Sequence, residues 1–325
     1  MRPAILLTAA MLAAWATPDG VLANPVPPAA PATTLGSPVR VADDPPGFYA
    51  PTFYRERGLT RSSGGFDAEA QDWVKPFQEY VASKPLRPTP SRRTVYLLPL
   101  GPVDEKMATR IGLVRAFLTV YLTLPVRTLP AAGLVGCRSR PAEVTGQSVE
   151  QYEAGHLMTH LVASRQSADA LTVIGLATVD LYAADRDWPS LAHLARTGEG
   201  LGVCSLARTF PEFFGRRSKP DMVYRDRRLA FSMVADTACR TLGLTPCRKY
   251  YCVMNQVRRS STTEPLHLCP DCLRKLRWTL RFDVIARYET LERFYREVGM
   301  PVEGTWVRRR LGECRRALAE KRNLK

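Results

Sequence analysis

Histidine is scarce in this chain: four occur among 325 residues, and none lies between His193 and His267. The sequence also shows no internal repeat, and beyond its first residues it has no apolar run long enough to cross a bilayer. These absences exclude a repeat architecture, a later membrane span and a histidine-ligated metal site between residues 194 and 266.

The overall composition is that of a folded protein with a basic surface. Hydrophobic residues make up 45% of the chain, which is ordinary for a globular domain and sufficient for a substantial core. Lys and Arg number 46 against 31 Asp and Glu, a formal net charge of +15. Such charge favours an acidic partner, whether a protein, a nucleic acid or an anionic membrane surface, although basic runs are most often a solvated face.

The N-terminus has the layout of a targeting peptide. Arg2 precedes an apolar run over residues 4–16, and small residues follow at Val21-Leu22-Ala23, which predicts a cleaved secretory signal peptide. A mitochondrial presequence is the alternative, because no acid precedes Asp19. Residues 24–46, rich in Pro and Ala, predict a flexible linker.

Strand-like and helix-like segments alternate after residue 93. Short apolar runs predict strands at residues 94–101, 124–129, 170–182 and 202–210, and helical spacing predicts helices at residues 106–122, 149–165 and 227–242. This alternation indicates an α/β fold with a mixed, largely parallel sheet. The expected division is a targeting peptide (1–23), a linker (24–46), an N-terminal extension (47–93), the α/β domain (94–300) and a basic C-terminal helix (301–325).

Four of the eight cysteines crowd into one short stretch, at Cys247, Cys252, Cys269 and Cys272. A four-residue gap separates the first two, and the last two form a C-P-D-C pair, which is ligand spacing for a tetrahedral zinc thiolate site. Buried or disulfide-paired cysteines are the alternative, and the even count would allow disulfides if the chain is secreted.

Several segments together resemble one family. "TVIGLATVDLY", "GLGVCSLARTF", "GLTPCRKYYCVM" and "LCPDCLRKLRWTLRFDVIARYETL" occur in the order found in the archaemetzincins, single-domain zinc metallopeptidases of the metzincin clan. The resemblance covers about two-thirds of the chain. The family signature is H-E-x-x-H-x-x-G-x-x-H-C, followed by C-x-M and C-x-x-C, so the resemblance implies a metzincin-like single domain.

The catalytic half of that signature is missing. Placing Gly243 on the motif glycine puts the three metal ligands at Asp236, Arg240 and Pro246 and the general base at Thr237. Arginine stays protonated and cannot ligate zinc, threonine is not a carboxylate base, and proline has no ligating side chain. The resemblance therefore implies a pseudopeptidase with no catalytic residues.

The structural half is present. Cys247, Cys252, Cys269 and Cys272 match the four cysteines that hold a second, structural zinc in the family, and Met254 matches the methionine of the turn below the catalytic site. We expect one structural zinc ion in a binding or scaffold protein, with an acidic partner or a peptide in the former substrate cleft. The alternative is a zinc metallopeptidase with an altered site.

Other residues carry weaker signals. His156 and His160 stand one helical turn apart, but no third ligand is near them in sequence. His267 lies two residues before Cys269 and could replace a thiolate. Asp180 falls at a strand end, where a turn cap is the ordinary role, and Cys239 reads as a buried thiol.

The residues in the first two ligand positions suggest what replaces the metal. Asp236 and Arg240 are opposite charges at i and i+4 with the acid N-terminal, the favourable orientation on a helix. We therefore expect a direct ion pair between them, facing the cleft beneath Met254.

Overall fold

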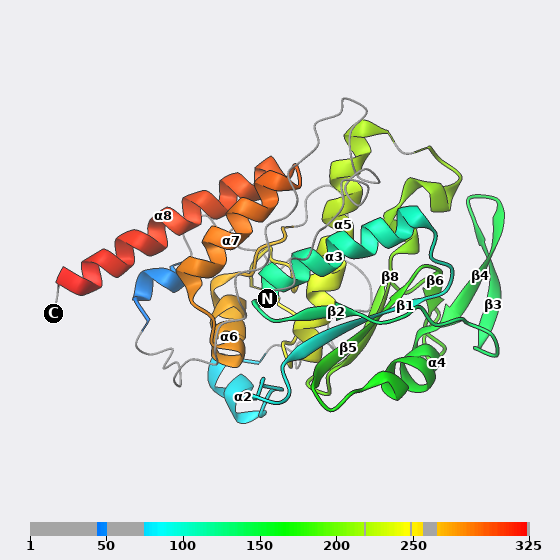
Figure 1. Ribbon diagram of the computed structural model, residues 1–325, viewed down its shortest axis with the longest axis horizontal. Helices are drawn as coiled ribbons and strands as arrows, with labels where there is room; N and C mark the ends of the chain where they lie inside the picture. Colours follow the sequence, from blue (N-terminus) through cyan, green and yellow to red (C-terminus); the bar gives the residue numbers. More distant parts are fainter. Residues whose placement is uncertain (1–43, 51–74, 218, 248, 256–264, 324–325) are drawn as a thin grey trace, which may run out of the picture.

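The computed structural model describes residues 44–50, 75–217, 219–247, 249–255 and 265–323 (Figure 1). The expected targeting peptide and most of the expected linker lie outside these residues, so both stay predictions. None of the described helices is both long and apolar enough to span a bilayer.

A five-stranded sheet forms the centre of the molecule, in the order β2-β1-β5-β8-β7. Its first four strands in that order are mutually parallel, and β7 runs antiparallel to β8 at one edge. The α/β class with a largely parallel sheet is thus confirmed. The strands are β1 (Thr94–Leu100), β2 (Val126–Thr128), β5 (Ala170–Ala177), β7 (His193–Arg196) and β8 (Leu201–Ser205).

A second, three-stranded sheet lies beside the first and was not expected. It contains β3 (Ser139–Val144), β4 (Gln147–Glu153) and β6 (Asp180–Tyr182). The helix predicted over residues 149–165 is wrong over residues 149–153, which belong to β4. Thr145 and Gly146 both have positive φ, as a two-residue hairpin turn requires, and this turn pairs β4 with β3. The strand predicted over residues 170–182 is also two strands, because β6 leaves the main sheet and pairs with β4.

Helices cover the main sheet (Figure 1). Along β1, Val95 and Leu97 belong to the core shared with the long helices, whereas Leu98 and Leu100 belong to a core shared with α4. This alternation follows the period of two along a strand, so both sheet faces are buried. The helices are α2 (Phe77–Ala82), α3 (Glu105–Leu122), α4 (Ala154–Leu157), α5 (Pro220–Thr241), α6 (Pro270–Leu280), α7 (Val284–Glu297) and α8 (Pro301–Asn323).

Helix α5 approaches the sheet closely because small residues line the contact. A Cβ atom built on Gly202 of β8 would lie 2.9 Å from Thr237 Cγ2, so any larger residue there would push the helix away. The hydroxyl groups of Thr172 on β5 and Thr241 on α5 also form a 2.9 Å hydrogen bond. The helix ends as expected at Gly243, whose φ of +105° suits the glycine that follows a helix.

Helices α6, α7 and α8 stand to one side of the sheet, and α8 carries the C-terminal end of the described chain (Figure 1). The short turn of residues Pro46–Tyr49 packs on α8, where the fully buried Arg310 donates hydrogen bonds to the carbonyl oxygens of Phe48 and Gly47, at 2.7 and 3.2 Å. Asp44 forms an ion pair with Arg277 of α6. These polar contacts attach the N-terminal segment to the helical side of the domain.

Candidate functional site

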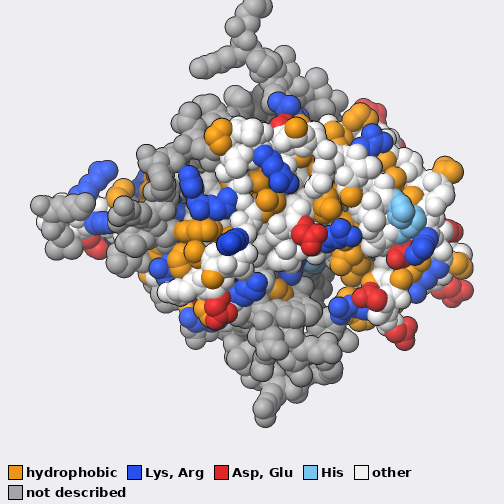
Figure 2. All heavy atoms as spheres, turned by 90° about the horizontal axis from the view of Figure 1, so that it is seen from below, with side chains coloured by type: hydrophobic (Ala, Val, Ile, Leu, Met, Phe, Trp, Pro, Cys, Tyr) orange, Lys and Arg blue, Asp and Glu red, His pale blue; other side chains and the backbone are white. Residues whose placement is uncertain are grey.

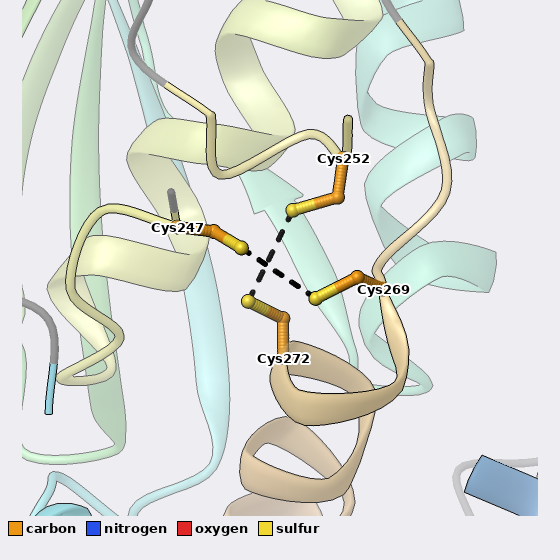
Figure 3. Close-up of side chains that lie close together, drawn as sticks. All are labelled: Cys247, Cys252, Cys269 and Cys272. Atoms are coloured by element: carbon orange, nitrogen blue, oxygen red, sulfur yellow. Dashed lines mark hydrogen bonds between the residues drawn. The ribbon is translucent and has the colours of Figure 1, made fainter. Parts of the chain in front are cut away.

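Four cysteine side chains converge at the junction of α5 and α6 (Figure 3). Cys247 and Cys252 come from the loop after α5, while Cys269 caps α6 and Cys272 lies in its first turn. Pro270 occupies the first helical position, where its fixed φ favours helix formation. The C-P-D-C spacing therefore brings two sulfurs to the same side of the α6 N-terminus, opposite the two from the loop.

The sulfur positions fit a tetrahedral metal site. The four Sγ atoms all lie within 4.8 Å of one another and all four residues are buried. Sγ of Cys247 lies 3.6 Å from Sγ of Cys269, and the Cys252 and Cys272 sulfurs are 4.0 Å apart. Zinc–sulfur bonds of about 2.3 Å predict sulfur separations of about 3.8 Å in a regular tetrahedron. The donor set therefore fits zinc.

Disulfide pairing does not fit these positions. A disulfide holds its sulfurs about 2.05 Å apart, far closer than any pair in this cluster. No disulfide joins any of the eight cysteines, all of which lie within the described residues. The disulfide alternative for the cluster is therefore wrong.

The electrostatics of the cluster favour a bound cation. Hydrogen bonds from the neighbouring thiols, Cys252 first, lower the pKa of Cys247, so one thiolate is stabilised by its protonated neighbours. Burial raises the pKa of Cys252 well above its usual range, and hydrogen bonding to the other thiols, Cys247 first, does the same for Cys272. Four buried thiolates would repel one another, and a bound dication removes that repulsion.

The loop that carries the first two cysteines is closed by backbone hydrogen bonds. The amide of Cys247 donates to the carbonyl of Met254 at 2.9 Å, and the amide of Val253 donates to the carbonyl of His267, also at 2.9 Å. Met254 is fully buried. The methionine that the sequence placed in the turn thus helps to shape the loop of the cysteine site.

Asp236 and Arg240 form the expected ion pair on α5. Nε of Arg240 donates to Oδ1 of Asp236 at 3.0 Å, and the exposed fractions of the two side chains are 8% and 0%. This part of the expectation is confirmed. Nη2 of Arg240 is also buried, and the described residues offer it no hydrogen-bond partner.

A histidine completes this group, and sequence reasoning missed it. Nε2 of His193, from the first residue of β7, lies 3.0 Å from the second oxygen of Asp236. The turn between β7 and β8 is tied to the end of α5, because the amides of Gly198 and Gly200 donate to the carbonyls of Arg240 and Thr241, at 3.1 and 3.2 Å. No local pattern marks His193; only the antiparallel edge strand brings it to the helix.

Thr237 and Pro246 stand at the other two positions that the family resemblance assigned to the catalytic motif. Thr237 is fully buried, and its hydroxyl donates to the carbonyl of Met233 at 2.8 Å, one turn back on the same helix. Pro246 is buried in the loop just before the first cysteine of the cluster. Thr237 has a hydroxyl rather than a carboxylate, and Pro246 has no polar side-chain atom. Neither residue can therefore accept a proton from water as a general base.

The weaker histidine candidates do not converge with further ligands. The rings of His156 and His160 lie 4.1 Å apart. Within the described ranges, however, the four cysteines are the one group of three or more His, Cys, Asp or Glu ligand atoms close enough to share a metal ion. His267 stacks on Trp306 at 3.9 Å instead, and burial lowers its pKa to about 3.

Asp180 and Cys239 have structural roles. Asp180 accepts hydrogen bonds from Nε and Nη2 of Arg208 at 2.8 and 2.7 Å, and another from Gln151 at 2.7 Å, so it joins the three-stranded sheet to the turn that follows β8. This bidentate ion pair between Arg208 and Asp180 stands in place of the turn cap that the sequence predicted for Asp180. Burial raises the pKa of Cys239 to about 12, which keeps it a protonated and unreactive thiol.

Comparison with known proteins gives a consistent set of relatives. The chain is 31% identical to archaemetzincin-1 of Homo sapiens over 268 residues, which cover 73% of this chain and 52% of that protein. It is 27% identical to archaemetzincin-2 of Macaca fascicularis over 266 residues, which cover 69% of this chain and 71% of that protein. No protein-family model matches the chain.

Among solved structures, that of archaemetzincin from Archaeoglobus fulgidus is similar with a TM-score of 0.43 and 18% sequence identity. The match covers 56% of this chain and 99% of that one. The matched part of the chain spans about half the length of the archaemetzincin-1 relatives, at 52% of the human protein.

Proposed function

The chain belongs to the archaemetzincin family, and we propose that it is a member without peptidase activity, acting as a zinc-stabilised binding or scaffold protein. One observation carries this proposal. The guanidinium of Arg240 occupies the second ligand position of the family motif and pairs with Asp236, the residue in the first. A permanent positive charge 3.0 Å from the carboxylate opposes a dication at the same place and engages the acidic group at the first ligand position.

The zinc of this protein would be structural. Cys247, Cys252, Cys269 and Cys272 would hold it, and a set of four thiolates leaves no open coordination position for water or substrate. When bound, the ion joins the loop after α5 to the N-terminus of α6 and contributes to folding rather than to chemistry.

Binding at the former site is supported by its polar groups. Nη2 of Arg240 is a buried donor without a protein acceptor among the described residues, and Arg240 pairs with Asp236, which contacts His193 of the edge strand β7. The carbonyl oxygen of an extended peptide added to such an edge is the kind of acceptor that would satisfy it. We therefore propose that a peptide binds in the former substrate cleft.

An acidic partner remains part of the proposal. On the face shown in Figure 2, Lys and Arg side chains are spread among apolar and acidic ones rather than gathered in one block. A distributed positive charge of this kind accelerates encounter with an acidic partner and weakens with added salt. We also propose entry into the secretory pathway, with the mitochondrion as the alternative destination.

Metal counting tests the proposed function. We expect purified full-length protein to contain one zinc ion per chain by elemental analysis, because the described residues provide one complete ligand set. We also expect no chelator-sensitive peptide cleavage above a blank, because neither Thr237 nor Arg240 can act as a base. Two zinc ions per chain, together with metal-dependent turnover that disappears in Asp236→Ala, would contradict the proposal.

The alternative is a metallopeptidase with an altered site, and one observation favours it. His193 and Asp236 place an imidazole nitrogen and a carboxylate oxygen 3.0 Å apart at the former catalytic position, which are two ligand types that zinc accepts. A second zinc that is lost in His193→Ala, with the cysteine zinc retained, would support this alternative.

A further inference from the structure

A pocket of about 90 Å³ lies between α7, the start of α8 and residues 265–268. This volume is several times what a single water molecule needs. Much of its wall is apolar, including the side chains of Leu266, Leu291 and Val307. Neither the Asp236 and Arg240 pair nor any of the four clustered cysteines lines it, so the pocket is separate from both sites described above.

A buried arginine lines this pocket with part of its hydrogen-bonding capacity unused. Arg287 of α7 is 3% exposed, and its Nε donates to the carbonyl of Tyr121 at 2.8 Å. Its guanidinium carbon lies 4.7 Å from the ring centroid of Tyr121 and 5.1 Å from that of Phe282. Nη2 of Arg287 is buried and has no hydrogen-bond partner in the described part of the chain.

A second residue that lines the pocket also has a buried donor without a hydrogen-bond partner among the described residues. Tyr121, at the end of α3, is 1% exposed, and its hydroxyl finds no hydrogen-bond partner among the residues described. Buried donors without acceptors are rare in folded proteins, and each one calls for an explanation. Both belong to residues that line the same pocket, which points to an acceptor that comes from outside the chain.

The charge of the pocket favours an anionic acceptor. Among the described residues that line the pocket, Glu303 is the one carboxylate. It already lies 2.8 Å from Nε of Arg228 and accepts a 2.7 Å hydrogen bond from the hydroxyl of Tyr224. Arg287 therefore gives the pocket an uncompensated positive charge in an apolar setting, where an unpaired charge is costly.

We propose that this pocket binds a small organic carboxylate. The carboxylate oxygens accept hydrogen bonds from Nη2 of Arg287 and from the Tyr121 hydroxyl, and the hydrocarbon part packs on the apolar wall. An inorganic anion would satisfy the donors but leave the apolar wall uncovered. Water alone would leave the positive charge uncompensated.

Calorimetric titration of the full-length, zinc-loaded protein tests this proposal with three probes. We expect sodium butyrate to bind with a dissociation constant on the order of 1 mM. Butyramide, which has the same shape without the charge, should show no measurable binding. Inorganic phosphate should bind at least about tenfold more weakly than butyrate, because it cannot use the apolar wall.

Two variants connect the binding to these donors. Tyr121→Phe removes one hydroxyl that has no protein partner, so the fold should be kept while butyrate affinity falls about tenfold or more. Tyr182→Phe, a hydroxyl deletion on β6 outside the pocket, should leave the affinity unchanged. Three results would each overturn the proposal. They are equal binding of butyrate and butyramide, no binding of butyrate at a concentration of about 10 mM, tenfold above the expected dissociation constant, and an unchanged affinity in Tyr121→Phe.

Discussion

Replacing Cys272 with serine is expected to abolish zinc binding and to unfold the domain. Zinc in four-thiolate sites of small domains contributes about 10–16 kcal/mol of apparent binding free energy at neutral pH, and this free energy is available only to the folded state. The whole stability of a typical domain is about 5–15 kcal/mol, so losing even part of the zinc contribution removes a large share of it. Cys272 is 2% exposed in the first turn of α6, so its thiolate lies inside the closed site.

The measurement is zinc content together with thermal unfolding by circular dichroism. Cys314→Ser is the matched control, because Cys314 is also fully buried but lies on α8 outside the cluster. Burying one hydroxyl there should cost about 1–3 kcal/mol and leave the zinc content unchanged. If Cys272→Ser kept its zinc or melted together with the control, the cysteine cluster would not be a structural metal site.

Replacing Arg240 with methionine is the second change expected to have a large effect. The side chain of Asp236 is fully buried, so the substitution removes its closest described cation and leaves the His193 contact in place. Removing one member of a buried ion pair costs about 3–5 kcal/mol, because the other charge is left without compensation. We expect a loss of this size in the free energy of unfolding measured by urea titration.

The chain provides a matched control on α7. Arg296 and Glu292 form an ion pair with the same i, i+4 spacing, but the Arg296 side chain is 62% exposed. Arg296→Met should therefore cost less than about 0.5 kcal/mol.

A double variant separates charge from packing. Adding Asp236→Asn to Arg240→Met removes the stranded charge and keeps an acceptor for His193, so most of the lost stability should return. Equal losses in the single and double variants would show that Arg240 acts through its volume, and the idea that an ion pair replaced the metal would then be wrong.

The sequence by itself determined those features that depend on local spacing. Cys269 and Cys272 come together because a proline starts a helix between them, and Gly243 ends α5 because glycine accepts positive φ. Asp236 and Arg240 are neighbours because residues four apart share a helix face. Each of these follows from one helical turn or one backbone angle, so each was readable from the printed residues.

Tertiary structure alone decided the contacts between distant segments. His193 reaches Asp236 because β7 pairs antiparallel at the sheet edge, and the strand expected over residues 170–182 divides because β6 pairs with β4. Arg287 and Tyr121 meet because α7 packs on the end of α3. Such contacts depend on strand order and helix packing, which no local pattern encodes, since many partners fit the same hydrophobic faces.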